Sequence, residues 1–364
     1  MEKSILLTAG GTGGHLFPAQ SLAGELKARG FVVELATDER ADRYGQEFPA
    51  RKIHIVSSAT TRGKDPISLA KTAFALTRGF IHSVSILRRL KPQAVVGFGG
   101  YPTFPPMMAA RFLRIPTILH EQNAVMGLAN RMLAPRVTGI AQSFNETRLA
   151  EEFAATATHT GNPVRPAVIE ASGQPYDAPE ADGDFRLLVF GGSQGARFFS
   201  DLMPDVLEAL DPALRARLKL VQQCRPEDME RVRARYDALG VAADLAPFFV
   251  DMPARIAQSH LVVCRSGASS VAELSVIGRP SILVPLPHAL DQDQTANAQV
   301  LEAAGGAWCI QQSELTPKRM ADELAALMNA PAKLAAAAQA AQAQGRPDAV
   351  KRLADLVERI GKRA

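Results

Sequence analysis

The sequence predicts an α/β fold with two Rossmann-like domains, each a parallel sheet covered by helices on both faces. Short apolar segments alternate with helical patterns along the chain, which is typical of such sheets. A glycine-rich turn occurs twice, at residues 10–14 and 191–195, each between an apolar segment and a helical pattern. A stretch dense in Gly and Pro, residues 161–184, separates the two halves and predicts a linker.

The first half opens with an apolar segment, a glycine turn and a helix. Leu16, Ala19, Leu22, Ala23 and Leu26 recur at helical spacing, and Gly30 ends the helix. The strands expected in this half lie at residues 4–8, 31–36, 53–57, 94–98, 116–119 and 138–141.

The second half repeats the order and ends in helices. Strands are expected at residues 186–190, 218–222, 261–264, 281–284 and 307–310. The Ala-rich residues 330–343 favour a helix. The last segment, from about residue 345 to 364, carries apolar residues on one face and needs a surface to pack on. We therefore predict domains at 1–162 and 163–344, with the last helix packing back on the first domain.

Composition excludes several classes of protein. The chain has 364 residues, 47% of them hydrophobic, which suits two globular domains. Cys224, Cys264 and Cys309 are scattered, which argues against a disulfide framework or a structural zinc site and suits a reducing compartment. Residues 94–110 are uncharged, but several Gly and Pro residues interrupt them, so they do not predict a membrane-spanning helix.

The positive charge lies in the first half. Residues 1–163 carry 19 Lys and Arg and 12 Asp and Glu, or +7, whereas the remaining residues carry 22 and 25, or −3. A basic first half suggests an anionic partner, such as a membrane surface, a nucleotide or a nucleic acid.

The two glycine turns are candidate anion sites. Glycine lets the backbone approach an anion, and the next helix offers unpaired N–H groups and the positive end of its dipole. A diphosphate is the natural ligand, although a plain strand-to-helix connection stays open for each turn. Neither turn matches the P-loop, and Leu16 breaks the dinucleotide fingerprint, so a dehydrogenase is disfavoured.

His15 follows the first turn directly, where it could act as a general base because its ordinary pKa lies near working pH. A packing or capping role at the helix start is equally open. The segment 120–123, His-Glu-Gln-Asn, follows a strand, where parallel sheets bind ligands; a plain polar loop is again the alternative.

Two polar segments in the second half are candidates for nucleotide-sugar binding. Glu273 could accept hydrogen bonds from ribose hydroxyls, but Ser270 and Glu273 also have the spacing of a capping box, which the residues alone slightly favour. In the amide-rich run 288–297, Gln294 and Asn297 share a helix face. Asp291 and Asp293 match a metal-binding triplet that is common by chance, so we expect no metal there.

Basic and apolar residues interleave between Lys64 and Lys91. A helix of this kind can lie on an anionic bilayer, or it can be an ordinary helix with a core face and a solvated basic face. Nucleic acid is disfavoured by the low aromatic content, 6%, and by the absence of recognition motifs.

The motifs together closely resemble those of the MurG family, the UDP-N-acetylglucosamine transferases of bacterial peptidoglycan synthesis. They are GGTGGH at 10–15, GGYP at 99–102, HEQN at 120–123, GNPVR at 161–165, GGSQGAR at 191–197, CRSGASSVAE at 264–273 and the Asp-x-x-Gln-x-x-Asn-Ala run at 291–298. The resemblance covers nearly the whole chain. It implies a glycosyltransferase-B-type fold, with the two Rossmann-like domains facing a cleft.

The resemblance also implies the activity. UDP-GlcNAc would donate N-acetylglucosamine to the muramyl 4-hydroxyl of undecaprenyl-diphosphate-linked muramyl pentapeptide (lipid I), giving lipid II with inversion and without a metal or cofactor. The protein would sit peripherally on the cytoplasmic face of the inner membrane, with the 64–91 region on its anionic surface.

Site residues carried over by motif fall into two groups. His15 would be the catalytic base, with Glu121 as a second catalytic residue and Tyr101 near the acceptor. The substrate-binding residues would be Thr12, Gly13, Gly14, Asn123, Arg165, Ser193, Gln194, Phe249, Ala268, Ser269, Ser270, Val271, Ala272, Glu273, Gln294 and Asn297. Phe249 would act through its backbone beside uracil. Asp293 replaces the His or Gln common in the family.

Other functions remain as alternatives. A UDP-GlcNAc 2-epimerase of the same architecture would need no acceptor, and product analysis with UDP-GlcNAc alone separates it from a transferase. Another glycolipid glycosyltransferase is disfavoured by the HEQN and GGYP motifs. A non-catalytic nucleotide-sugar binder would bind the donor and never release UDP.

Overall fold

The structure, a computed structural model, describes residues 2–39, 48–58, 66–287 and 290–362, with the backbone alone at residues 66, 67, 193–196 and 290. The chain forms two compact units. Unit 1 comprises Met1–Arg165 with Arg346–Ala364, and unit 2 comprises Pro166–Gly345. The sequence placed the corresponding boundaries after residues 162 and 344.

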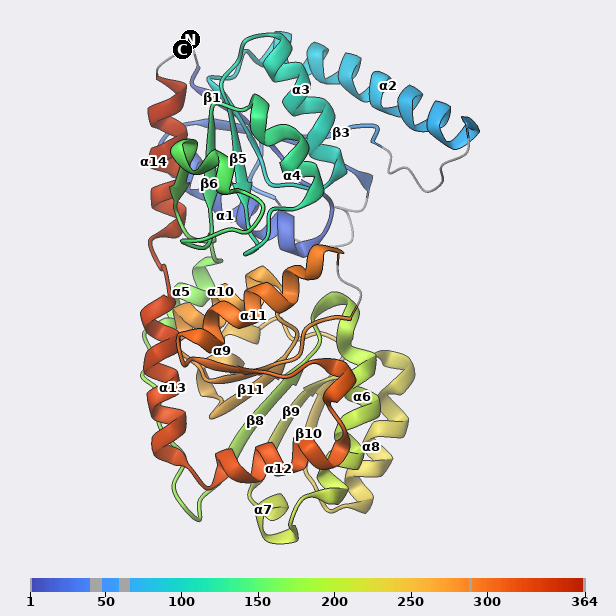
Figure 1. The fold of residues 1–364 in the computed structure, drawn as a ribbon, viewed down its shortest axis with the longest axis vertical. Helices are drawn as coiled ribbons and strands as arrows, with labels where there is room; N and C mark the ends of the chain where they lie inside the picture. Colours follow the sequence, from blue (N-terminus) through green and yellow to red (C-terminus); the bar gives the residue numbers. More distant parts are fainter. Residues whose placement is uncertain (1, 40–47, 59–65, 288–289, 363–364) are drawn as a thin grey trace. The chain divides into compact units, whose positions relative to one another are not determined.

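Unit 1 is built on a seven-stranded sheet in the order β3-β2-β1-β4-β5-β6-β7, in which all neighbouring strands are parallel (Figure 1). The strands are β1 (Ser4–Thr8), β2 (Val32–Thr37), β3 (Lys52–Ile55), β4 (Ala94–Gly97), β5 (Thr117–Glu121), β6 (Gly139–Gln142) and β7 (Ala157–His159). Its α-helices are α1 (Gly13–Ala28), α2 (Pro66–Leu90), α3 (Phe104–Phe112), α4 (Leu128–Leu133) and α14 (Ala349–Gly361). Short 3-10 turns lie at Tyr101–Thr103, Ala134–Arg136 and Glu151–Thr156.

Unit 2 contains a six-stranded parallel sheet in the order β10-β9-β8-β11-β12-β13. The strands are β8 (Phe185–Phe190), β9 (Leu218–Gln223), β10 (Ala243–Ala246), β11 (Leu261–Cys264), β12 (Ser281–Leu283) and β13 (Ala307–Cys309). The α-helices are α5 (Pro166–Ser172), α6 (Gly192–Ala209), α7 (Pro212–Ala216), α8 (Met229–Ala238), α9 (Met252–Gln258), α10 (Ala268–Ile277), α11 (Asp293–Ala303), α12 (Pro317–Met328) and α13 (Pro331–Gln344). Turns of 3-10 helix lie at Pro226–Asp228, Leu290–Gln292 and Gln312–Glu314. The expected α/β fold of two parallel-sheet domains is confirmed.

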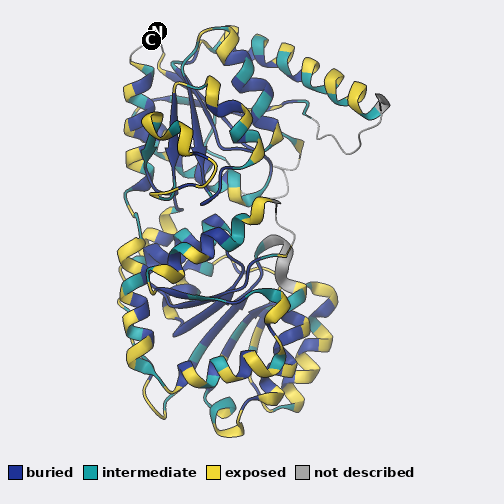
Figure 2. Ribbon diagram, viewed as in Figure 1, coloured by how far each residue is buried: buried dark blue, intermediate teal, exposed yellow. Residues whose placement is uncertain are grey.

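The central strands are buried on both faces, as their apolar sequences require. Figure 2 shows most of the strands in both sheets in the colour of buried residues. Every predicted strand overlaps an observed one. The sequence missed β7 and β10, which are edge strands whose residues are mostly half-exposed or exposed and therefore form no apolar run.

The predicted linker contains a helix that its sequence did not indicate. Within residues 161–184, α5 begins at Pro166, which suits a first helical position because its missing N–H needs no partner there. Val168 on this helix is fully buried, so the segment is partly folded into unit 2.

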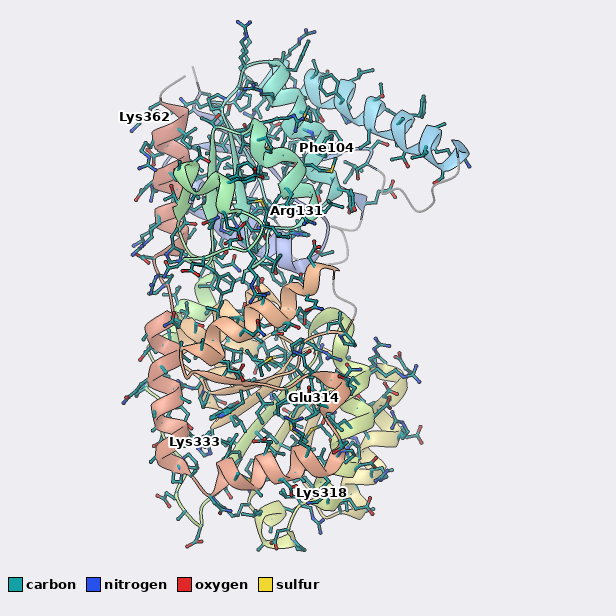
Figure 3. The ribbon with its side chains drawn as sticks, viewed as in Figure 1. Phe104, Arg131, Glu314, Lys318, Lys333 and Lys362 are labelled. Carbon is teal, nitrogen blue, oxygen red and sulfur yellow. The ribbon has the colours of Figure 1, made fainter. Side chains whose placement is uncertain are left out.

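The last helix, α14, completes the core of unit 1. Leu353 and Val357 are fully buried in the cluster that contains Leu22 of α1. At the rim, Arg29 pairs with Asp355 at 2.6 Å and with Glu358 at 2.9 Å. Lys362, near the end of the helix, lies 3.6 Å from Glu358 (Figure 3).

Each sheet reverses its strand order at one point. In unit 1, β1 pairs with both β2 and β4; in unit 2, β8 pairs with both β9 and β11. Ligands of open parallel sheets bind at the carboxyl edge beside this reversal. The motifs that end β1 and β4, and those that end β8 and β11, therefore lie where the topology favours binding. Within the described ranges, no helix is long and apolar enough to cross a bilayer.

Candidate active-site edges of the two units

The imidazole of His15 lies on the glycine turns of unit 1. A Cβ atom added to Gly10 would lie 3.1 Å from His15 Nδ1, and one added to Gly99 would lie 3.3 Å from His15 Nε2. Gly99 and Gly100 also have φ values of +83° and +78°, where a side chain is strained. Glycine at these positions therefore makes room for the ring and shapes the turn beside it.

Two hydroxyls organise this edge. Thr12 Oγ1 lies 3.0 Å from His15 Nδ1, so the side chain of the residue before α1 contacts the ring instead of capping the helix. Thr103 Oγ1 donates to the carbonyl of Gly99 at 2.7 Å and holds the second turn. Gly13 and Gly14 form the first turn of α1, where N–H groups lack helical partners.

Glu121 ends β5 and is 1% exposed. Its Oε1 accepts hydrogen bonds from the backbone N–H of Asn123 at 2.9 Å and from Asn123 Nδ2 at 3.4 Å. Its Oε2 accepts from the backbone N–H of Gly127 at 3.0 Å and from Asn130 Nδ2 at 2.8 Å. Burial raises the pKa of this carboxyl, and these four donors counter the rise. Glu121 therefore holds the 121–130 loop with both of its oxygens.

Asn130 connects this loop to the glycine turn. Its side-chain nitrogen binds Glu121, and its Oδ1 lies 3.5 Å from the point where a Gly99 Cβ would be. The sequence did not predict a role for Asn130, because this residue lies inside α4 and outside every motif.

His120 is fully buried, and burial lowers its pKa to about 4, so the ring is neutral near pH 7. Its Nε2 lies 3.1 Å from the carbonyl of Gly161, and its Nδ1 lies 2.9 Å from Gln122 Nε2. It therefore ties β5 to the 161–165 segment. In that segment the Arg165 guanidinium lies 4.9 Å from the centre of the Phe17 ring on α1. Tyr101 follows the second turn and is 37% exposed.

In unit 2, the first glycine turn leads directly into α6. Gly191 precedes the helix, and Gly192 has a φ of +66°. Ser193 and Gln194 belong to its first turn, while their side chains, and the predictions made for them, fall outside the described atoms. An N-terminal helix end after a glycine turn is a suitable anion site.

Phe249 follows β10 and is 5% exposed under Arg255, whose guanidinium lies 4.2 Å from the ring centre. The side chain is thus occupied in packing. That residue 249 acts through its backbone stays a prediction.

The segment 268–273 forms the first turns of α10, with Gly267 as the residue before the helix. Ala268, Ser269, Ser270, Val271 and Ala272 therefore lie within the helix together with Glu273, which is 8% exposed. The capping-box interpretation of Ser270 and Glu273 is wrong, because the helix begins before Ser270. Ser269 Oγ is buried and makes no hydrogen bond within the described part of the chain.

Gln294 and Asn297 join three segments of this edge. Gln294 Oε1 accepts a hydrogen bond from the backbone N–H of Leu286 at 3.0 Å, so Nε2 of the same amide points away from Leu286. Asn297 is fully buried and donates to the carbonyl of Ser266 at 3.1 Å, while Ser266 Oγ donates to the carbonyl of Gln294 at 2.8 Å. Asn297 therefore fixes the backbone of the segment around Ser266, between β11 and α10.

Asp291 and Asp293 form the beginning of this run. Asp293 accepts the backbone N–H of Gln294 at 2.9 Å, while burial raises its pKa. Among the described residues, no group of three or more His, Cys, Asp or Glu side chains is placed to hold a metal ion. His288 lies outside the described residues.

Arg265 is a supporting residue whose role the sequence did not predict. It is 5% exposed and donates to the carbonyls of Val284 at 3.1 Å and Pro285 at 3.0 Å, and to Gln312 Oε1 at 2.6 Å. Desolvation lowers its pKa to about 10. Its position directly after β11, where a strand meets a motif, is the signal that could have found it.

Comparison with known families assigns both units. Residues 5–142 match the glycosyltransferase family 28 N-terminal domain, and residues 186–353 match the glycosyltransferase family 28 C-terminal domain.

Full-length relatives carry one name. The chain is 58% identical over 359 residues to the UDP-N-acetylglucosamine--N-acetylmuramyl-(pentapeptide) pyrophosphoryl-undecaprenol N-acetylglucosamine transferase of Rhodopseudomonas palustris, covering 98% of both chains. It is 56% identical over 361 residues to the protein of the same name from Chelativorans sp., covering 98% of this chain and 95% of the relative.

Solved structures agree with this grouping. The crystal structure of Acinetobacter baumannii MurG has a TM-score of 0.80 and 28% identity, covering 99% of this chain and 100% of that one. A UDP-GlcNAc 2-epimerase from Neisseria meningitidis has a TM-score of 0.68 at 13% identity over 98% of this chain and 100% of that one, which shows a shared fold alone.

Proposed function

Because the chain belongs to the family of UDP-N-acetylglucosamine--N-acetylmuramyl-(pentapeptide) pyrophosphoryl-undecaprenol N-acetylglucosamine transferases, we propose that it makes lipid II. N-Acetylglucosamine passes from UDP-GlcNAc to the muramyl 4-hydroxyl of undecaprenyl-diphosphate-linked muramyl pentapeptide. The product serves peptidoglycan synthesis, on which cell shape and division depend. The observation that carries the proposal is the placement of His15 on the glycine turns at the strand-order reversal of unit 1.

His15 removes the proton from the acceptor hydroxyl as that oxygen attacks the anomeric carbon. Thr12 Oγ1, 3.0 Å from Nδ1, supports this role because a hydroxyl that accepts from Nδ1–H leaves the basic lone pair on Nε2. The attack is a single in-line displacement, so the anomeric centre inverts and no covalent nucleophile is needed.

UDP leaves from unit 2. The first-turn N–H groups of α6 bind its diphosphate. Preorganised donors of this kind stabilise charge that develops on a leaving group, a task for which many transferases use a divalent metal. We therefore expect the reaction to proceed in a chelator.

The donor sugar and ribose are bound by side chains of α10 and α11. Since Gln294 Oε1 is bonded to the Leu286 N–H, its Nε2 donates to a sugar hydroxyl. Glu273 accepts from the ribose hydroxyls. Asn297 and Glu121 do not contact the substrates in this proposal. They position the site, because their polar atoms hold loops of the protein.

Product analysis tests this function against the epimerase. With labelled UDP-GlcNAc and a polyprenyl-diphosphate muramyl pentapeptide, we expect the label to move into the lipid-linked product. Incubation with UDP-GlcNAc alone is expected to return unchanged donor. Formation of the 2-epimer in that control would contradict the proposal.

Helix α2 is proposed as the surface that contacts the membrane. Phe74 and Ile81 on α2 and Phe112 on α3 are 71%, 64% and 65% exposed, far more than apolar side chains of a packed helix. Phe80, Arg88 and Arg89 line a cavity of ≈ 550 Å³ together with Ile81 and Phe112. Ile86 and Leu87 of the same helix are buried in the core, so α2 has both a core face and an exposed apolar and basic face. We propose peripheral binding through this face to the anionic cytoplasmic face of the inner membrane. Lys64, at the start of the predicted region, lies outside the described residues.

Replacing Phe74 and Ile81 together by Ser is expected to weaken binding to vesicles containing anionic phospholipid by at least about tenfold, because each side chain loses about 1.5–3 kcal/mol of apolar burial. Vesicle cosedimentation measures the change. Ile169→Ser on α5 is the matched control, since Ile169 is 38% exposed in unit 2. Equal binding of both variants would contradict a membrane role for α2.

A further inference from the structure

Gln223 is a buried amide that joins two segments of the proposed donor site. It is the last residue of β9 and is 9% exposed. Its Oε1 accepts the backbone N–H of Gly191 at 3.2 Å, and its Nε2 donates to the carbonyl of Pro247 at 3.1 Å. One side chain therefore connects the glycine turn after β8 to the segment after β10.

The topology makes this bridge possible. In the sheet, β9 lies between β8 and β10, so its carboxyl end adjoins the turns that leave both neighbours. The next residue continues the ladder, since the Cys224 N–H donates to the carbonyl of Ala246 at 3.0 Å. The backbone beside Gln223 is thus fixed. Because one partner is a donor and the other an acceptor, the amide has one favourable orientation.

The two bridged segments have different proposed tasks. Gly191 directly precedes α6, whose first turn is assigned to the diphosphate. Pro247 precedes Phe249 by two residues, and the backbone of Phe249 is assigned to the uracil. The distance between these segments must match the length of a uridine diphosphate, in which base and diphosphate are covalently joined.

We propose that Gln223 is a positioning residue that sets the spacing between the uracil and diphosphate subsites. The inference rests on the proposed use of UDP-GlcNAc as donor and extends it to a residue that does not touch the substrate. A linked ligand gains affinity when both of its halves bind at once, and it loses that gain when their sites are misplaced. A change in the spacing is therefore expected to weaken the binding of UDP more than the binding of uridine or pyrophosphate.

Two variants separate the two hydrogen bonds. Gln223→Glu keeps an acceptor for the Gly191 N–H but places a carboxylate against the Pro247 carbonyl. Gln223→Met has a similar length and removes both bonds. For each variant we expect UDP affinity, measured by calorimetry, and KM for UDP-GlcNAc to worsen by about tenfold, as expected for the loss of one or two buried hydrogen bonds. Uridine affinity, kcat at saturating donor and KM for the lipid acceptor should change by less than about twofold.

Gln222→Met is the matched control. Gln222 is fully buried on the same strand, and its Oε1 accepts the hydroxyl of Tyr236 in the core of unit 2. Because the role of this amide is purely structural, its replacement is expected to lower the melting temperature and to leave KM for UDP-GlcNAc unchanged. If the Gln223 variants behave like Gln222→Met, the inference is overturned.

Calorimetry keeps this inference distinct from the proposed function. A wild-type protein that binds UDP but transfers no sugar overturns the transferase proposal, while the ratio of UDP to uridine affinity in the variants still decides the role of Gln223. A wild-type protein that does not bind UDP overturns both.

Discussion

His15→Ala is expected to lower kcat by about 10²- to 10⁴-fold, the usual cost of losing a general base, while UDP-GlcNAc affinity stays within about twofold. The donor is assigned to unit 2, whereas His15 lies on the glycine turns of unit 1. Initial rates at saturating donor and acceptor, with calorimetry for the donor, measure the two quantities.

The controls for His15 separate chemistry from folding. His82→Ala removes an exposed histidine of α2 in the same unit and should leave kcat unchanged. Thr12→Val removes the hydroxyl that contacts Nδ1 and should cause a smaller loss than His15→Ala. Parallel losses of affinity and turnover in His15→Ala would show that the residue shapes a binding site and is not the base.

Glu121→Gln is expected to lower both stability and turnover. The carboxylate accepts only from N–H groups, so an amide places its own NH₂ against the donors of one oxygen and leaves one backbone N–H and one side-chain amide unpaired. A buried group left without its partner costs about 1–3 kcal/mol, so we expect about 3 kcal/mol for this loop. Thermal unfolding and kcat are the measurements.

The same variant distinguishes a positioning role for Glu121 from direct catalysis. Glu152→Gln, an exposed site in the same unit, is the control and should change neither quantity. A Glu121→Gln protein with wild-type melting temperature and an altered pH–rate profile would contradict the positioning role and favour direct proton transfer by this carboxyl.

The fold was predictable because each central strand is a short apolar run followed by a recognisable turn. β1 and β8 show this most clearly, since glycine turns follow both. The edge strands β7 and β10 were missed because half-exposed edges have no such pattern. The helix α5 was missed because its short sequence lies among Gly and Pro residues that predict a linker.

The site was predictable as a set of segments and less so as individual contacts. Motif position placed His15, Glu121 and Glu273 near the carboxyl edges of the sheets. The sequence could not show that both oxygens of Glu121 would accept hydrogen bonds within its own loop. The four donors belong to Asn123, Gly127 and Asn130, and two of them are backbone N–H groups, which carry no sequence signal. Helix start was also ambiguous, because Ser270 and Gly267 are both acceptable beginnings. Gln223 and Asn130 lie outside the motifs, so only the folded chain places them beside the glycine turns.

The central claim, acceptor-dependent and metal-independent transfer, is tested most directly by UDP release from UDP-GlcNAc in EDTA, with and without the polyprenyl-diphosphate muramyl pentapeptide. Release only when the acceptor is present is the result we predict. Release without acceptor would indicate a hydrolysing epimerase, and release that requires an added divalent metal would contradict the role given to the α6 N-terminus. No release under any of these conditions, from a protein that binds UDP-GlcNAc, would contradict the transferase itself.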